Sequence, residues 1–243
     1  SSPARPFAML AAALRRSGRT REAVEAARSA LARDACDFMA VNELRLASAA
    51  LGGDADARDA AEKQAASMRR SVLNYIDLAL DYAACSGFTA EALDVLALLD
   101  RFGADDAADM PLAFYCRGRL LAMRSDGAGA TEWFRKGREA DVRGVYPNRP
   151  EFEEILRVAS EADAEDANAR LLLGNLYASR FRTEEAIKLW KSAVRLRPGW
   201  ELPMRNIALA LLVEKKEPRG ALRWMEKALA AAPGDYRLLC EAD

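Results

Sequence analysis

The chain has 243 residues with 36 basic and 37 acidic side chains, so its formal net charge is −1. This balance argues against broad electrostatic capture of nucleic acid or of an acidic membrane surface. The sequence contains no histidine, which removes the commonest general base and metal ligand and every histidine-dependent catalytic triad. Alanine, the best helix former, is abundant, whereas glycine and proline number only 14 and 9. The composition therefore predicts an all-helical protein.

The cysteines and the two chain ends suggest where the protein is found. Cys36, Cys85, Cys116 and Cys240 form no CxxC motif, so we expect no structural zinc. Their apolar neighbours predict buried free thiols in a reducing, cytoplasmic compartment. No apolar run is long enough to predict a membrane-spanning helix. A start without methionine and an end inside an apparent helix suggest a piece of a longer protein, and the excess of alanine and arginine suggests a bacterial source.

Residues 1–145 contain four degenerate helix pairs. In each pair, apolar and small residues recur at helical spacing. The first pair turns at 18–20, the second reaches Met68, and the third and fourth cover about 75–99 and 114–137. The residues that carry the pattern are Leu10, Leu14, Ala23 and Ala27; Leu44, Leu51 and Ala60; Tyr75, Tyr82, Ala92 and Leu96; and Phe114, Gly118, Phe134 and Gly137.

A solitary extra helix is predicted at 146–165. Gly118 and Gly174 hold equivalent positions 56 residues apart, about 22 more than one 34-residue repeat. The excess contains the proline-rich run YPNRP at 146–150 and an amphipathic stretch at 151–162. We interpret it as an inserted helix entered through a proline-rich turn.

Residues 166–243 hold the clearest repeat. Two helix pairs are predicted, followed by residues 235–240, which open a further helix. Within a pair, Gly174 leaves room for the second helix, on which Trp190 fills the space between small residues. Three pairs of anchor residues share an offset of 35 positions: Ala186 and Ala221, Ala193 and Ala228, and Pro198 and Pro233.

The stacking of these pairs defines the fold class. Because no helix pair covers its own apolar faces, the pairs should stack into a right-handed α-solenoid of about six antiparallel pairs plus the extra helix. Pro198-Gly199 ends one pair and starts the next, since proline cannot continue a helix and glycine tolerates a left-handed turn. No alternating segment predicts a β-strand.

The order Leu173-Gly174-x-x-Tyr177, Ala186, Ala193 and Pro198 resembles the tetratricopeptide repeat. The resemblance is strong over 167–199, good over 201–234 and degenerate upstream. It implies a non-catalytic interaction scaffold without cofactor or metal, whose partner is a protein or a peptide segment.

A closer resemblance rests on 146–156, on the Gly-Asn-Leu-Tyr run at 174–177 and on the ending at 234–241. These stretches resemble the C-terminal repeat array of large bacterial proteins that also carry a β-rich, mutarotase-like domain of unknown function. The resemblance implies that the missing N-terminal domain of the same polypeptide is another candidate partner. The alternative function is that of an accessory domain of a carbohydrate-active protein, in contact with glycan.

The expected partner-binding surface is the concave wall formed by the first helices of the pairs. Its mixture of apolar, amide and basic side chains suits an extended peptide or a helix. The candidate residues are Tyr115, Arg119, Asn168, Leu171, Asn175, Ser179, Arg205, Asn206 and Leu209.

Two of these asparagines have an alternative role. Asn175 and Asn206 match two residues of the carboxylate clamp found in some tetratricopeptide proteins. Leu171 stands where that clamp has lysine, and the third repeat of the clamp is missing. Hydrogen bonding between helices is therefore the expected role of both asparagines.

Three other features could suggest a ligand but favour structure. The paired arginines at 15–16 and 69–70 indicate a solvated face rather than a nucleic-acid site. Asp105, Asp106 and Asp109 predict a helix cap rather than a cation site. The four tryptophans could stack on sugars, but three lie at or just before core positions and Trp200 lies at a repeat junction, so packing is predicted instead; they are Trp133, Trp190, Trp200 and Trp224.

Overall fold

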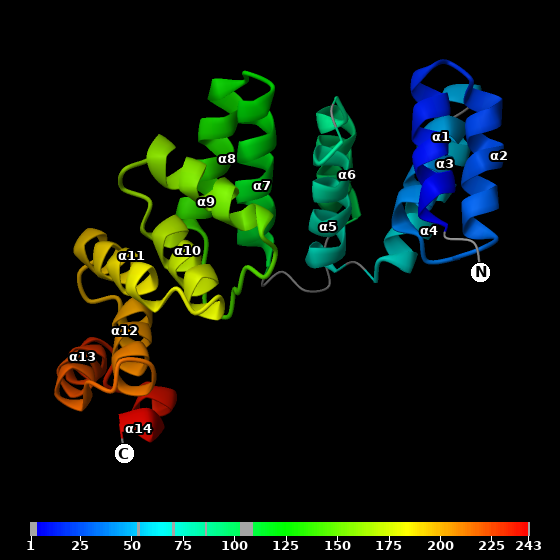
Figure 1. Cartoon of the computed structure of the whole chain (residues 1–243). Coiled ribbons are helices and arrows are strands. Elements are labelled where there is room, and N and C mark those ends of the chain that lie inside the picture. The colour runs from blue at the N-terminus through cyan, green and yellow to red at the C-terminus, as the bar shows by residue number, and fades with distance from the viewer. Residues whose placement is uncertain (1–3, 53, 70, 86, 103–108, 243) are drawn as a thin grey trace. The chain divides into compact units, whose positions relative to one another are not determined.

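The computed structural model describes residues 4–52, 54–69, 71–85, 87–102 and 109–242 of the chain. These residues form fourteen helices and no strand (Figure 1), as the composition predicts. The chain divides into two compact units, Ser1–Ala107 (unit 1) and Ala108–Asp243 (unit 2). The division of the repeats at 145 and 165 stays a prediction. Of the predicted acidic cap, Asp105 and Asp106 lie outside the described residues.

Unit 1 contains three antiparallel helix pairs. The helices of each pair pack along one another, and α1 and α2 are joined by a turn in which Gly18 has φ +80°, a left-handed conformation that glycine adopts without strain. In the order of the chain, the helices are α1 (Arg5–Arg16), α2 (Thr20–Leu31), α3 (Phe38–Gly52), α4 (Asp54–Ser67), α5 (Val72–Ala83) and α6 (Thr89–Phe102).

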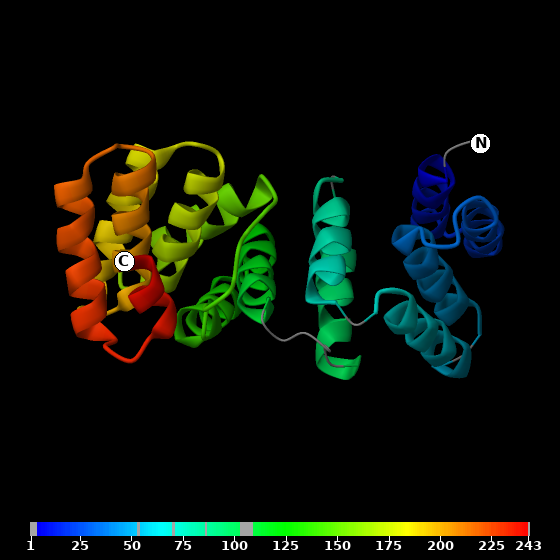
Figure 2. The same ribbon diagram turned by 90° about the horizontal axis from the view of Figure 1, so that it is seen from below.

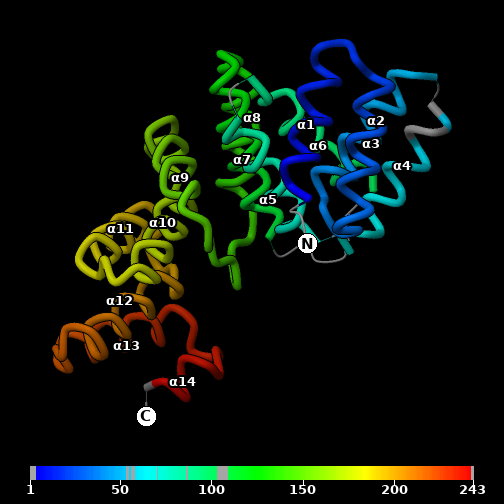
Figure 3. Tube along the Cα trace, turned by 45° about the vertical axis from the view of Figure 1, so that its right-hand side comes forward, coloured from blue at the N-terminus to red at the C-terminus, as the bar shows by residue number. Residues whose placement is uncertain are grey.

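Unit 2 contains three further pairs, α7–α8, α10–α11 and α12–α13, whose helices lie side by side (Figure 2). The solitary α9 packs between α7 and α10 (Figure 3). The described residues therefore show six pairs, the extra helix α9 and the C-terminal helix α14, as predicted. The helices are α7 (Met110–Met123), α8 (Gly127–Glu139), α9 (Glu151–Ala162), α10 (Ala167–Ser179), α11 (Thr183–Leu196), α12 (Glu201–Val213), α13 (Pro218–Ala231) and α14 (Tyr236–Ala242).

The interlocking of small and large residues is confirmed. A Cβ atom placed on Gly118 would lie 2.4 Å from the Phe134 ring, and one on Gly174 would lie 2.5 Å from Trp190 Nε1. Both distances are well below van der Waals contact, so each glycine allows the partner helix its close approach. Gly199, after α11, has φ +82°, as the predicted left-handed turn requires.

The cysteines correct one expectation. Cys116 is buried and Cys85 is half-buried, but Cys36 and Cys240 are exposed. The prediction of burial from apolar sequence neighbours is wrong at these two positions. Cys36 lies in the connection between α2 and α3, and Cys240 lies on the exposed side of α14.

The tryptophans divide into two groups, all in unit 2. Trp190 and Trp200 are 4% and 7% exposed, so their predicted packing is confirmed. Trp133 and Trp224 are half-buried. Cationic side chains cover their rings: Lys136 Nζ is 3.8 Å from the Trp133 ring centroid, and Lys227 Nζ is 4.5 Å from that of Trp224.

Candidate functional site

A cavity of about 410 Å³ lies between α10 and α12, and we name it the α10–α12 groove. Its lining is mainly apolar, with two amides, two hydroxyl-bearing aliphatic side chains, the Tyr146 phenol and one carboxylate. The lining residues are Tyr146, Asn175, Ala178, Ser179, Thr183, Trp190, Asn206, Leu209, Ala210, Val213 and Glu214.

Helical periodicity places these side chains together. The lining residues of α10 are spaced three and four apart, as are those of α12, so each set occupies one helix face. Thr183 and Trp190 lie seven residues apart on α11, again on one face, and α11 packs against both α10 and α12. The groove therefore has two walls from first helices and a floor from the second helix between them.

A short chain of hydrogen bonds runs along the groove. Trp190 Nε1 donates to Asn175 Oδ1 at 3.1 Å, and Asn206 Nδ2 donates to the same oxygen at 2.9 Å. With Oδ1 accepting twice, the orientation of the Asn175 amide is fixed, and its NH₂ group remains the donor end. The predicted hydrogen bond between helices is therefore confirmed for Asn175 and Asn206.

The structure brings four of the nine candidate residues together. Asn175, Ser179, Asn206 and Leu209 all line the groove. Arg205, next to Asn206, instead pairs with Glu241 of α14, with Nε 2.6 Å from Oε2. That ion pair raises the pKa of Arg205 above its ordinary value, so this cation is already committed to a carboxylate.

Arg119 lies outside the groove. It projects from α7 toward α9, where its Nη2 is 3.5 Å from Glu154 Oε1. This candidate therefore takes part in the packing of α9 on α7 and not in the lining of the α10–α12 groove.

The other three candidates require a correction. Tyr115, Asn168 and Leu171 are 0%, 1% and 1% exposed, so none of them belongs to an open surface. Asn168 Nδ2 lies 2.8–3.0 Å from three carbonyl oxygens at the end of α8, and Tyr115 Oη donates to Asp166 at 3.0 Å. These side chains face neighbouring helices. The helical spacing by which they were selected does not distinguish a buried helix face from one on the concave wall.

Several lining residues were not among the sequence candidates. Trp190 was assigned to the core, and it is both buried and part of the groove floor. Tyr146, 64% exposed, arrives from the connection before α9. The proline-rich run predicted this connection, but no local sequence pattern predicts that Tyr146 lies beside α10 and α12.

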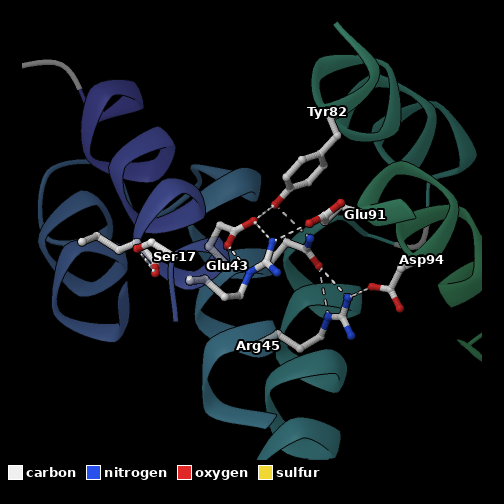
Figure 4. Close-up of polar contacts among 9 residues, drawn as sticks. Ser17, Glu43, Arg45, Tyr82, Glu91 and Asp94 are labelled. Atoms are coloured by element: carbon white, nitrogen blue, oxygen red, sulfur yellow. Dashed lines mark hydrogen bonds and ion pairs between the residues drawn. The ribbon is translucent and has the colours of Figure 1, made fainter. Parts of the chain in front are cut away.

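A second polar cluster is enclosed in unit 1, around Glu43 of α3 (Figure 4). The Glu43 carboxylate is fully buried. It accepts from Arg15 Nε at 2.7 Å and from Tyr82 Oη at 2.7 Å. Arg15 Nη2 also donates to Glu91 at 2.9 Å. Burial, reinforced by the Glu43 charge, raises the pKa of Tyr82 well above its ordinary value.

The same cluster continues along α3. Asn42 Nδ2 donates to Tyr82 Oη at 3.0 Å, and Arg45 donates to Asn42 Oδ1 and to Asp94. Side chains of α1, α3, α5 and α6 thus meet in one network. Because its buried charges are paired and hydrogen-bonded, we interpret the network as one that holds these four helices together and not as a reactive centre.

Neither a candidate metal site nor a membrane-spanning helix is found among the residues that the structure describes. In this part of the chain, no group of three or more cysteine, aspartate and glutamate side chains is arranged to hold a metal ion. None of the helices described above has the length and apolar content that crossing a membrane requires.

Replacing Gly174 with alanine is expected to destabilise unit 2 by about 1–3 kcal/mol, because the new Cβ displaces the Trp190 indole. Urea unfolding followed by tryptophan emission measures the change. Gly220→Ala is the matched control, since its Cβ would meet nothing closer than 3.4 Å. Equal stability of the two variants would contradict the interlocking of α10 and α11.

Comparison with known proteins gives weak structural likeness. The chain matches no protein-family model and no curated protein. Solved structures similar to it include YrrB, "a TPR protein with an unusual peptide-binding site", at 17% identity and a TM-score of 0.36, covering 98% of this chain and 90% of that one. TTC0263 of Thermus thermophilus has 19% identity and a TM-score of 0.35, covering 98% of this chain and 96% of that one.

A third similar structure is MamA from Desulfovibrio magneticus RS-1, at 16% identity and a TM-score of 0.36, covering 97% of this chain and 98% of that one. These TM-scores are too low to establish a shared fold. The helix-pair architecture is instead shown by the contacts between consecutive helices of this chain.

Proposed function

We propose that this chain is a non-catalytic helical-repeat scaffold that holds a polypeptide segment in the α10–α12 groove. The observation that carries the proposal is the groove itself, in which apolar side chains surround a fixed pair of amides. Two first helices supply the walls, as the tetratricopeptide resemblance leads us to expect of a partner-binding surface.

The size and chemistry of the groove suit a polypeptide. Its volume of about 410 Å³ lies in the range of pockets for small ligands, about 300–1,000 Å³, so it has room for the side chains of a short segment. Tyr146 and Val213 are 64% and 54% exposed at its rim, and large exposed apolar side chains favour association. The amides of Asn175 and Asn206 can meet the backbone groups of an extended segment.

Two alternatives belong to the same proposal. The occupant of the groove is either a separate protein or a missing domain of the same polypeptide, and the groove chemistry serves both. The accessory role in a carbohydrate-active protein has less support, because none of the four tryptophans on which it was based offers an open face for sugar stacking. Trp190 and Trp200 are buried, and cations cover Trp133 and Trp224.

The test is a selection of binding peptides from a random library on the intact chain. We expect Leu209→Glu, which places a charge in the apolar wall, to weaken selected peptides at least about 10-fold, or about 1.4 kcal/mol. Leu222→Glu is the control for the added charge, because Leu222 is 57% exposed on α13 and outside the groove. Leu209 also packs against the core around Met204 and Met225, so circular dichroism must show that Leu209→Glu remains folded. Peptides that bind both variants equally well would refute the groove as the binding site.

A glycan role is tested in parallel. Addition of oligosaccharides is expected to leave tryptophan emission unchanged, whereas a groove-bound peptide should alter it through Trp190. A saturable response to oligosaccharide that survives Leu209→Glu would instead favour the carbohydrate alternative.

A further inference from the structure

We infer that the segment bound in the α10–α12 groove is apolar and carries a lysine or arginine side chain at the Glu214 end. The inference rests on the proposed function, since it specifies the partner of the same groove. It follows from the distribution of charge around the lining residues.

The first observation is the identity of the charged groups. Among the described residues that line the groove, Glu214 alone is charged, and it is exposed. Most cations next to lining residues have carboxylate partners, and Arg180 shares Glu153 with Arg182. Lys191, next to Trp190, is exposed and does not line the groove. Arg205 pairs with Glu241 at 2.6 Å, Arg182 with Glu153 at 2.8 Å, and Lys215 with Glu184.

Lys216 is the remaining cation near this end of the groove. It lies in the turn after α12, is exposed and does not line the groove. A bound segment therefore meets one carboxylate and no lining cation among the residues that the structure describes. An acidic segment would lose hydration there without gaining an ion pair.

The second observation is the direction of the helices. Ser179 and Val213 are the last residues of α10 and α12, and both line the groove. The carbonyl ends of two helix dipoles therefore lie at the same end as Glu214, and helix C-termini favour cations. The opposing N-terminus of α11, at Thr183, is a single positive end, and Glu184 and Glu185 of its first turn pair with Lys215 and Arg182. Two negative helix ends therefore face one positive end here.

Apolar side chains determine the rest of the segment. Leu209, Ala210 and Val213 form the wall beside Glu214. A lysine or arginine can lie along such a wall with its aliphatic stem and place its charged group at the carboxylate. We therefore expect a basic residue flanked by aliphatic or aromatic residues in the bound segment.

The experiment uses peptides selected on the intact chain and measures their dissociation constants by fluorescence anisotropy. We expect enrichment of lysine or arginine at one peptide position. Glu214→Gln should weaken these peptides about 2- to 5-fold, and replacing the peptide cation by alanine should cost the same. In the double variant the two losses should not add, because they remove one interaction.

The control variant is Glu226→Gln, because Glu226 is exposed on α13 and outside the groove; it should leave affinity unchanged. Peptides that depend on Leu209 but are acidic, or are indifferent to Glu214→Gln, would overturn this inference and leave the proposed function standing. Peptides indifferent to Leu209→Glu would overturn the proposed function itself.

Discussion

Glu43→Gln is expected to lower the free energy of unfolding of unit 1 by about 3–5 kcal/mol. The buried carboxylate is removed from Arg15 and Tyr82, so a guanidinium that is only 16% exposed loses its closer partner. Breaking one side of a buried ion pair leaves an uncompensated charge, which costs more than the pair contributes. The effect should therefore exceed that of any exposed ion pair in the chain.

Two spectroscopic signals separate the units in this measurement. All four tryptophans lie between 133 and 224, so tryptophan emission reports unit 2, whereas far-ultraviolet circular dichroism reports both units. In urea, Glu43→Gln should move the unfolding transition of unit 1 to lower urea concentration. Circular dichroism detects this transition, whereas tryptophan emission does not. We expect the emission transition to stay in place.

Glu22→Gln is the matched control. Glu22 pairs with Arg19, but the two side chains are 52% and 58% exposed, and exposed pairs contribute little. Joint replacement of Arg15 and Glu43 by leucine should recover part of the stability, because no buried charge is then left alone. A Glu43→Gln variant as stable as Glu22→Gln would show that the network does not stabilise the packing of the helices that it links.

Asp166→Asn is expected to stabilise unit 2 by about 3 kcal/mol at pH 7.5 and to change little near pH 4. Burial raises the pKa of Asp166 from 3.8 to about 6, and each pKa unit corresponds to about 1.4 kcal/mol. Asp166 caps α10 by accepting from the Ala169 backbone N–H at 2.8 Å. Asparagine keeps this cap, and its NH₂ group can donate to Tyr115 Oη.

The sign of the pH dependence follows from proton binding. Between about pH 4 and 6 the folded state holds a proton on Asp166 that the unfolded state has lost. Stability from this group is therefore present below the unfolded pKa and is lost as pH rises through about 6. Tryptophan-detected urea unfolding across this range should show the decline in the parent chain and less of it in Asp166→Asn.

Asp163→Asn provides a control of opposite sign. Asp163 is partly exposed and accepts from Arg138 at 2.7 Å, and the pKa of its carboxylate lies below the ordinary value. Its removal should slightly lower stability at pH 7.5, by up to about 1 kcal/mol. If the free energy of unfolding of the parent chain changed between pH 4 and 6 just as that of Asp166→Asn does, the raised pKa of the buried Asp166 would be contradicted.

The candidate site was only partly predictable. Asn175 and Asn206 were identified because the repeat places first-helix residues on one wall, and both line the groove. Asn168 lies seven residues before Asn175 and has the same helical phase, yet it is buried against the end of α8. Whether a residue of that phase meets a partner or a neighbouring helix depends on which element packs over it, and the end of α8 covers Asn168.

The amino-acid sequence by itself determined the helices, their pairing and the interlocking of Gly118 with Phe134 and Gly174 with Trp190, because helix propensity, turn residues and side-chain volume act over short chain distances. Only the tertiary structure decided the network around Glu43 and the contribution of Tyr146 to the groove. The partners of Glu43 are 28 and 39 residues away along the chain, and Tyr146 comes from a connection whose path no local pattern specifies. Burial and charge pairing are properties of the assembled helices, so the function of a polar residue in this chain is determined by what packs against it.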